Sequence, residues 1–106
     1  MYKLVKKSEA TERVQSDSWV IKNYLTKDFS KDFSIATAKL NGKHSLTKSE
    51  TSDRIYYVTA GSVVFTLEGT LVTAQKGDIL FIEKNTDYAF DGKCEVVLIN
   101  IPAFGV

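Results

Sequence analysis

The chain has 106 residues, of which 43% are hydrophobic and 25% are charged. This length and composition indicate one ordinary globular domain over residues 1–106 and exclude disordered, collagen-like and coiled-coil classes. The 14 basic and 13 acidic residues leave a net charge of +1. Because so small a net charge creates no strong positive electrostatic potential to attract a polyanion, we expect no nucleic-acid partner.

Apolar stretches in the sequence are short. Examples are Ile79–Ile82 and Val96–Ile99, far below the roughly 20 residues that a membrane-spanning helix needs. The N-terminal sequence MYKLVKKSEATERV also lacks the apolar core of a secretory signal. We therefore expect no membrane association and a cytoplasmic location.

Runs rich in Val, Ile, Thr, Tyr and Phe recur between turn residues, and helical periodicity is hard to find, which is the pattern of an all-β protein. Residues 1–17 are expected to form an N-terminal arm or edge strand, and the polar stretch 41–53 the longest loop. The expected strands are Tyr2–Val5, Ser18–Leu25, Phe33–Leu40, Arg54–Ala60, Ser62–Leu67, Thr70–Ala74, Asp78–Ile82, Asp87–Phe90 and Glu95–Ile101.

Glycines between these runs predict short turns. Gly61, Gly69 and Gly77 each separate two expected strands, and glycine adopts positive φ with little strain. Short turns make successive strands antiparallel neighbours. Closing them into an antiparallel β-barrel or jelly roll would remove exposed strand edges.

The glycine spacing also matches two known motifs. The pattern G(X)5HXH(X)3E(X)6G fits from Gly42 to Gly61 without a gap, and G(X)5PXG(X)2H(X)3N begins at Gly77. The segment from Arg54 to Gly61 (RIYYVTAG) is also similar to the usual strand of proteins that carry these motifs. The chain thus resembles the cupin superfamily, as a small single-domain protein of the cupin 2 type, and the resemblance implies a jelly-roll β-barrel.

The metal-ligand positions of these motifs are changed in this chain. They fall on Lys48, Glu50, Arg54 and Tyr88. A divalent metal needs several deprotonated N or O ligands, which ammonium and guanidinium groups cannot supply. We therefore expect a degenerate site with no metal and no cofactor, in which Glu50 forms a salt bridge to Lys48 or Arg54.

The resemblance implies that these side chains enter the barrel. Residues two apart on a strand share a face, so Lys48 would point with Glu50, and Arg54 with Tyr56. Two cations and one carboxylate leave a surplus positive charge, which suits a carboxylate or phosphate. The expected partner is a small anionic or hydroxyl-rich, sugar-like molecule. Its expected ligand-binding residues are Lys48, Glu50, Arg54, Tyr56, Tyr88 and Phe90.

Two other functions stay open at this point. One is a metal-independent isomerase, epimerase or lyase on a sugar-like substrate, with Tyr88 as the acid and His44 or Glu50 as the base. The other is a structural or sensory barrel in which Lys48, Glu50 and Arg54 form a solvated ion network. Tyr57 is three positions from Arg54 on the same expected strand, so its side chain should face the opposite side, outward. Small cupins commonly pair through outer strands. We therefore expect a homodimer.

Overall fold

The computed structural model describes residues 1–16 and 18–106. Within these residues it contains a short 3-10 helix and seven strands, and all the strand pairs are antiparallel. The elements are η1 (Lys7–Glu9), β1 (Thr11–Ser16), β2 (Trp19–Leu25), β3 (Ser34–Thr47), β4 (Asp53–Leu67), β5 (Thr70–Gln75), β6 (Ile79–Ile82) and β7 (Tyr88–Ile101). The prediction of an all-β, antiparallel fold is confirmed.

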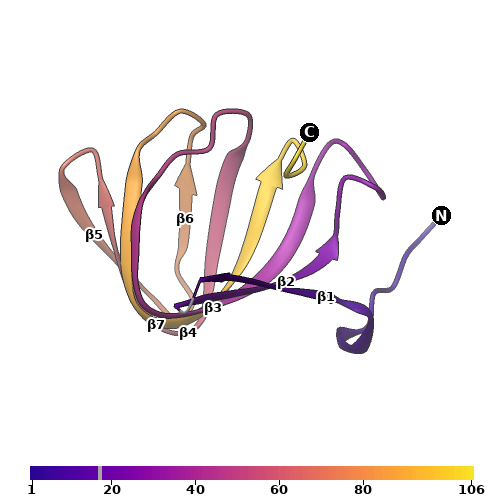
Figure 1. Ribbon diagram of the computed structural model, residues 1–106, viewed down its shortest axis with the longest axis horizontal. Coiled ribbons are helices and arrows are strands. Elements are labelled where there is room, and N and C mark those ends of the chain that lie inside the picture. The colour runs from indigo at the N-terminus through magenta and orange to yellow at the C-terminus, as the bar shows by residue number, and fades with distance from the viewer. Residues whose placement is uncertain (17) are drawn as a thin grey trace.

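The sheet is continuous and folds over on itself. Its strand order is β1-β2-β3-β7-β4-β5, and β6 also pairs with β4. The first part of β4 pairs with β6, whereas the second part, from Ser62, pairs with β5. Figure 1 shows the long strands β3, β4 and β7 curving so that the sheet wraps around one interior.

Gly69 and Gly77 lie in turns between strands, as expected, whereas Gly42, Gly61 and Gly92 lie inside the long strands. Gly42 on β3 is opposite Gly92 on β7, and Gly61 follows a register shift in β4 between Val58 and Ala60. A Cβ at Gly61 would collide with the carbonyl oxygen of Lys93. The expected turn at Gly61 was therefore wrong, because a β-bulge bends one continuous strand there. The strands expected on either side of Gly92 are likewise one strand, β7.

Two further boundaries differ from expectation. Residues 41–47, expected as loop, continue β3, because they pair with β7 as far as Thr47 opposite Tyr88. No strand forms at Tyr2–Val5, where Tyr2 and Leu4 are exposed and no neighbouring strand pairs with the backbone. Within the expected N-terminal segment 1–17, β1 forms one edge of the sheet; Asp17 lies outside the described residues.

Every second side chain along the strands points inward, and together these side chains form a core rich in aromatic rings. Tyr56, Phe65, Tyr88 and Phe90 have ring centroids 5.3 to 6.4 Å apart, and Trp19 packs edge-on against Phe90. This cluster fills one side of the interior and leaves the region near β1 and the end of β7 for polar side chains. No helix in the described part of the chain is long and apolar enough to cross a membrane.

Candidate functional site

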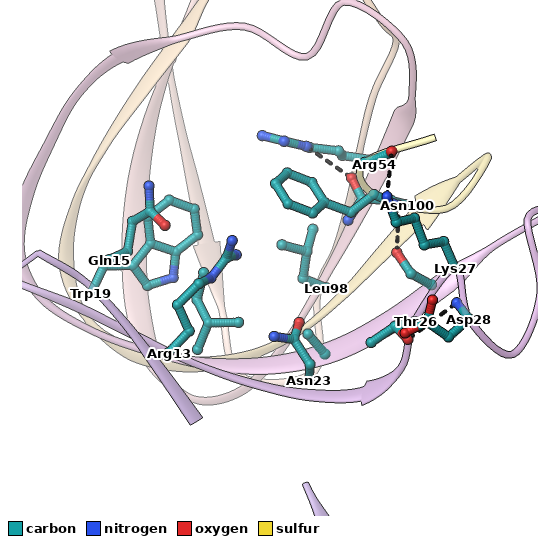
Figure 2. A pocket seen from close by; sticks show the side chains of 15 residues that line it. Arg13, Gln15, Trp19, Asn23, Thr26, Lys27, Asp28, Arg54, Leu98 and Asn100 are labelled. Carbon is teal, nitrogen blue, oxygen red and sulfur yellow. Dashed lines mark hydrogen bonds between the residues drawn. The ribbon is translucent and has the colours of Figure 1, made fainter. Parts of the chain in front are cut away.

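A cavity of about 320 Å³ opens between β1, β2, the start of β4 and the end of β7. This volume is at the small end of the range for ligand pockets. Figure 2 shows side chains from these strands projecting into it. Its polar lining residues are Arg13, Gln15, Asn23, Thr26, Lys27, Asp28, Ser34, Arg54 and Asn100, and its larger apolar ones are Trp19, Ile21, Leu98 and Phe104.

Arg54 is fixed in this cavity by two hydrogen bonds. It donates from Nε to Oδ1 of Asn100 over 2.9 Å and from Nη1 to the hydroxyl of Tyr88 over 2.7 Å. Asn100 lies directly opposite Arg54 on the neighbouring strand β7. Burial acts to lower the pKa of Arg54, but Tyr88 and Tyr56 more than offset this effect, so the pKa is raised overall. The group is therefore a permanent cation with its remaining N–H donors beside the cavity.

Two buried tyrosines support Arg54. The hydroxyls of Tyr56 and Tyr88 are hydrogen-bonded over 2.7 Å, and the residues are 1% and 0% exposed. Burial, followed by the neighbouring Tyr88, raises the pKa of Tyr56 well above its usual value. Neither tyrosine lines the cavity. In this conformation they position Arg54, and they would contact a ligand directly only if the Arg54 side chain moved.

His44 lies on the inner face of β3, between Trp19 and Phe90. Its ring centroid is 4.5 Å from that of Trp19 and 4.8 Å from that of Phe90. Burial, and secondarily the charge of Arg54, lowers the pKa of His44. Since Trp19 lines the cavity, His44 is separated from it by one side chain. A neutral imidazole here can accept a proton at neutral pH.

The other expected site residues divide into two groups. Phe90 is buried in the core beside Trp19 and His44 and does not line the cavity. Lys48 and Glu50, in contrast, are exposed and do not line the cavity. Among the described residues, Glu50 forms no ion pair with Lys48 or Arg54. The expected inward pair was wrong because the register shifts between His44 and Thr47 and β3 ends there, so strand alternation does not reach Lys48.

Sequence reasoning missed the cavity residues that lie outside the two motifs. Arg13 comes from β1, Trp19 and Asn23 come from β2, and Phe104 follows β7. Asn100 had a usable signal, because it continues the inward alternation of Cys94, Val96 and Leu98 with a polar side chain. A buried polar residue in an apolar row needs a partner, and that partner is Arg54.

No protein-family profile matches the chain, and no curated protein matches it significantly. Solved structures do match. A variant of Pac13 from Streptomyces, with uridine, is 23% identical, with a TM-score of 0.88 over 99% of this chain and 85% of that one. KdgF from Halomonas is 17% identical, with a TM-score of 0.86 and coverages of 99% and 97%. A predicted oxalate decarboxylase from Thermotoga maritima is 25% identical, with a TM-score of 0.80 and coverages of 94% and 99%.

The chain is a small protein of the cupin fold. The prediction made from the glycine spacing is therefore confirmed. Metal ligands of cupins come from the motif positions that hold Lys48, Glu50, Arg54 and Tyr88 here. In residues 1–16 and 18–106, no three His, Cys, Asp or Glu side chains cluster where they could hold a metal ion. With Arg54 held as a cation and Lys48 and Glu50 outside the cavity, the donors present do not fit a metal.

Proposed function

We propose that the cavity of this cupin binds a small hydroxyl-rich molecule of the sugar or nucleoside class, which can carry an anionic group. The main support is the fixed position of Arg54, which presents its free N–H donors to the cavity while Asn100 and Tyr88 hold its other donors. Trp19 and Phe104 offer apolar faces on which a sugar or planar ring can pack. The polar lining also favours ligand binding over a purely structural barrel.

The similar structures support the same ligand class. Pac13 is described as a unique nucleoside dehydratase, and three of its structures contain uridine. Two of these carry a tyrosine-to-phenylalanine replacement and one carries a histidine-to-glutamine replacement. The present chain has the same residue types beside Arg54, namely Tyr56, Tyr88 and His44. A nucleoside is therefore a well-motivated first probe.

A second candidate function is catalysis by proton transfer, as an isomerase, epimerase or lyase. The observation that favours it is the lowered pKa of His44, which leaves a neutral base near a fixed cation. His44 and Tyr88 do not line the cavity, so this function requires the Trp19 and Arg54 side chains to move when a substrate binds. His44 would then remove a proton from the carbon next to a carbonyl, and the Arg54 cation would stabilise the negative charge that forms on the oxygen. Return of the proton completes an isomerisation or epimerisation, whereas loss of a hydroxyl as water, with a proton from Tyr88, completes an elimination.

The binding proposal is tested by calorimetric titration with uridine and with glucose. Replacing Arg54 by alanine should weaken a bound probe by roughly 1.5 to 3 kcal/mol, the scale for a hydrogen bond to a charged group. Lys48→Ala and Glu50→Ala are the matched controls and should change affinity by less than about 0.5 kcal/mol. Unchanged affinity in Arg54→Ala would place the site elsewhere, and failure of both probes to bind would favour the structural alternative.

We also infer that a second copy of the chain covers an apolar area on the outside of the sheet. This outer apolar face consists of two rows across β6, β4 and β7, in which Phe81, Ile55 and Ile99 are neighbours, as are Ile79, Tyr57 and Val97. Phe81 and Ile79 are 57% and 67% exposed. The six residues carry no charge, and exposed apolar areas of this kind often mark protein–protein interfaces. The outer apolar faces of two chains can contact each other about a two-fold axis, the commonest symmetry of soluble oligomers.

A further inference from the structure

The two arginines of the sequence line the same cavity. Arg54 enters from β4, and Arg13 enters from the edge strand β1, where it lies opposite the buried Ile21 and so faces inward. Figure 2 shows both side chains projecting into this space. The surroundings of the two groups differ. Arg54 has acceptors on Asn100 and Tyr88, whereas the Nε of Arg13 is buried without any hydrogen-bond partner among the described residues.

The described charges around Arg13 leave a surplus of positive charge. Among residues 1–16 and 18–106, the cavity lining contains three cationic side chains, Arg13, Lys27 and Arg54, and one carboxylate, Asp28. In the described part of the chain, Arg13 forms no ion pair with Asp28, and Lys27 donates to the backbone carbonyl of Gly105 over 3.1 Å. A buried donor without an acceptor is unfavourable, because its hydrogen bond to water is lost and not replaced. An oxyanion in the cavity would supply the missing acceptor.

The C-terminal segment fixes the orientation of Arg13. The guanidinium carbon of Arg13 lies 5.0 Å from the centroid of the Phe104 ring. The backbone N–H of Phe104 in turn donates a hydrogen bond to Oγ of Ser34 over 2.9 Å. A guanidinium packed against an aromatic face keeps its N–H edge free. That edge can bind two oxygens of one carboxylate or phosphate group at the same time.

We propose that Arg13 forms an anion subsite, which binds a carboxylate or phosphate group of the ligand, while Arg54 binds the hydroxyl-bearing part. This assignment deepens the proposed function, and the full ligand rests on that proposal. The anion subsite itself can be tested without it. The anion subsite gives charged ligands, such as sugar acids or sugar and nucleoside phosphates, a higher affinity than their neutral counterparts, because only the charged ligands bind Arg13.

The first experiment uses anions alone. The Nε–Hε resonances of the two arginines are assigned with Arg13→Lys and Arg54→Lys and followed during titration with inorganic phosphate and with acetate. The Arg13 resonance should shift saturably with at least one anion, and the anion that shifts it at lower concentration identifies the preferred group. A shift of Arg54 alone, or of neither resonance, would overturn the subsite.

The second experiment compares uridine with uridine 5′-monophosphate, and glucose with glucuronate. Arg13→Gln should weaken at least one charged probe about tenfold or more, equivalent to about 1.4 kcal/mol, and change its neutral counterpart less than about twofold. Lys22→Gln, which removes a cation from the outer side of β2 opposite Glu12, is the charge-matched control and should change neither. Equal weakening of both members of a pair would contradict the subsite.

The two experiments also separate the two proposals. If phosphate or acetate shifts Arg13 but no uridine or glucose derivative binds, the anion subsite stands and the proposed function fails. If uridine and its monophosphate bind equally well and Arg13→Gln affects neither, the proposed function stands and the anion subsite fails.

Discussion

Arg54 and Tyr88 lie at opposite ends of the β4–β7 ladder and are nevertheless joined by a 2.7 Å hydrogen bond. Arg54 is paired with Asn100, whereas Tyr88 is paired with Leu67 at the other end of the same two strands. The bond exists because both strands bend and carry their ends to a common interior. Closure of the sheet therefore brings the residues of the site together, and the hydroxyl of Tyr88 connects the two ends of the β4–β7 ladder.

Removal of the Tyr88 hydroxyl should cost more stability than removal of the Tyr56 hydroxyl. Tyr88→Phe removes the acceptor of a partly buried guanidinium, for which about 1 to 3 kcal/mol is expected. Tyr56→Phe removes one bond between neutral hydroxyls, for which about 0.5 to 1.5 kcal/mol is expected. Denaturant unfolding of the two variants measures the difference. Equal losses would mean that Arg54 does not depend on Tyr88.

Protonation of His44 should destabilise the folded protein. Burial and the charge of Arg54 lower its pKa below the usual 6.5, so the unfolded chain takes up the proton first as the pH falls. The contribution of His44 to stability is therefore highest above pH 6.5, decreases as the pH falls towards the lowered pKa, and changes no further below it.

The measurement compares the free energy of unfolding at pH 7.5 and pH 5.5. The loss between these pH values should be smaller in His44→Gln than in the unmodified chain, while the carboxylates contribute equally to both. His44 is the chain's single histidine, so its imidazole proton signals can be titrated directly by NMR. A pKa at or above 6.5 would contradict the prediction.

Gly61 should tolerate alanine less well than Gly69, although both glycines have positive φ. Their φ angles are 73° and 82°, so alanine carries a similar backbone strain of about 1 to 2 kcal/mol at both positions. A Cβ at Gly61 would also collide with the backbone of Lys93, whereas a Cβ at Gly69 has no atom within 4 Å. The difference between the two variants in denaturant unfolding isolates this collision. Equal destabilisation would show that β4 and β7 can separate at the bulge without cost.

The sequence was sufficient to predict the fold and part of the site because those features are local. Glycine spacing identified the cupin fold, and strand alternation correctly placed Arg54 and Tyr56 on the inner face and Tyr57 on the outer face. Inward placement of Lys48 and Glu50 failed because alternation holds only while the ladder continues, and β3 ends at Thr47.

The remaining site residues could not be predicted from local patterns. Arg13 and Arg54 are 41 positions apart in the sequence, and they meet only after β1 and β2 close one side of the barrel. The described part of the cavity lining has a surplus of positive charge, as predicted, but Arg13 and Lys27 contribute to it in place of Lys48. The composition of one motif could not show this, because the cations come from different strands.

A charge on the outer apolar face should convert the proposed dimer into a monomer. Phe81→Lys places an ammonium beside Ile55, its neighbour on β4, and burying an unpaired charge against a second copy is strongly unfavourable. Leu71→Lys is the matched control, because Leu71 is also largely exposed but lies on β5, outside this face. Light scattering after size-exclusion chromatography should give a dimer mass for the unmodified chain and for Leu71→Lys, and a monomer mass for Phe81→Lys. A monomer mass for the unmodified chain would rule out the dimer, and a dimer that survives Phe81→Lys would place the interface elsewhere.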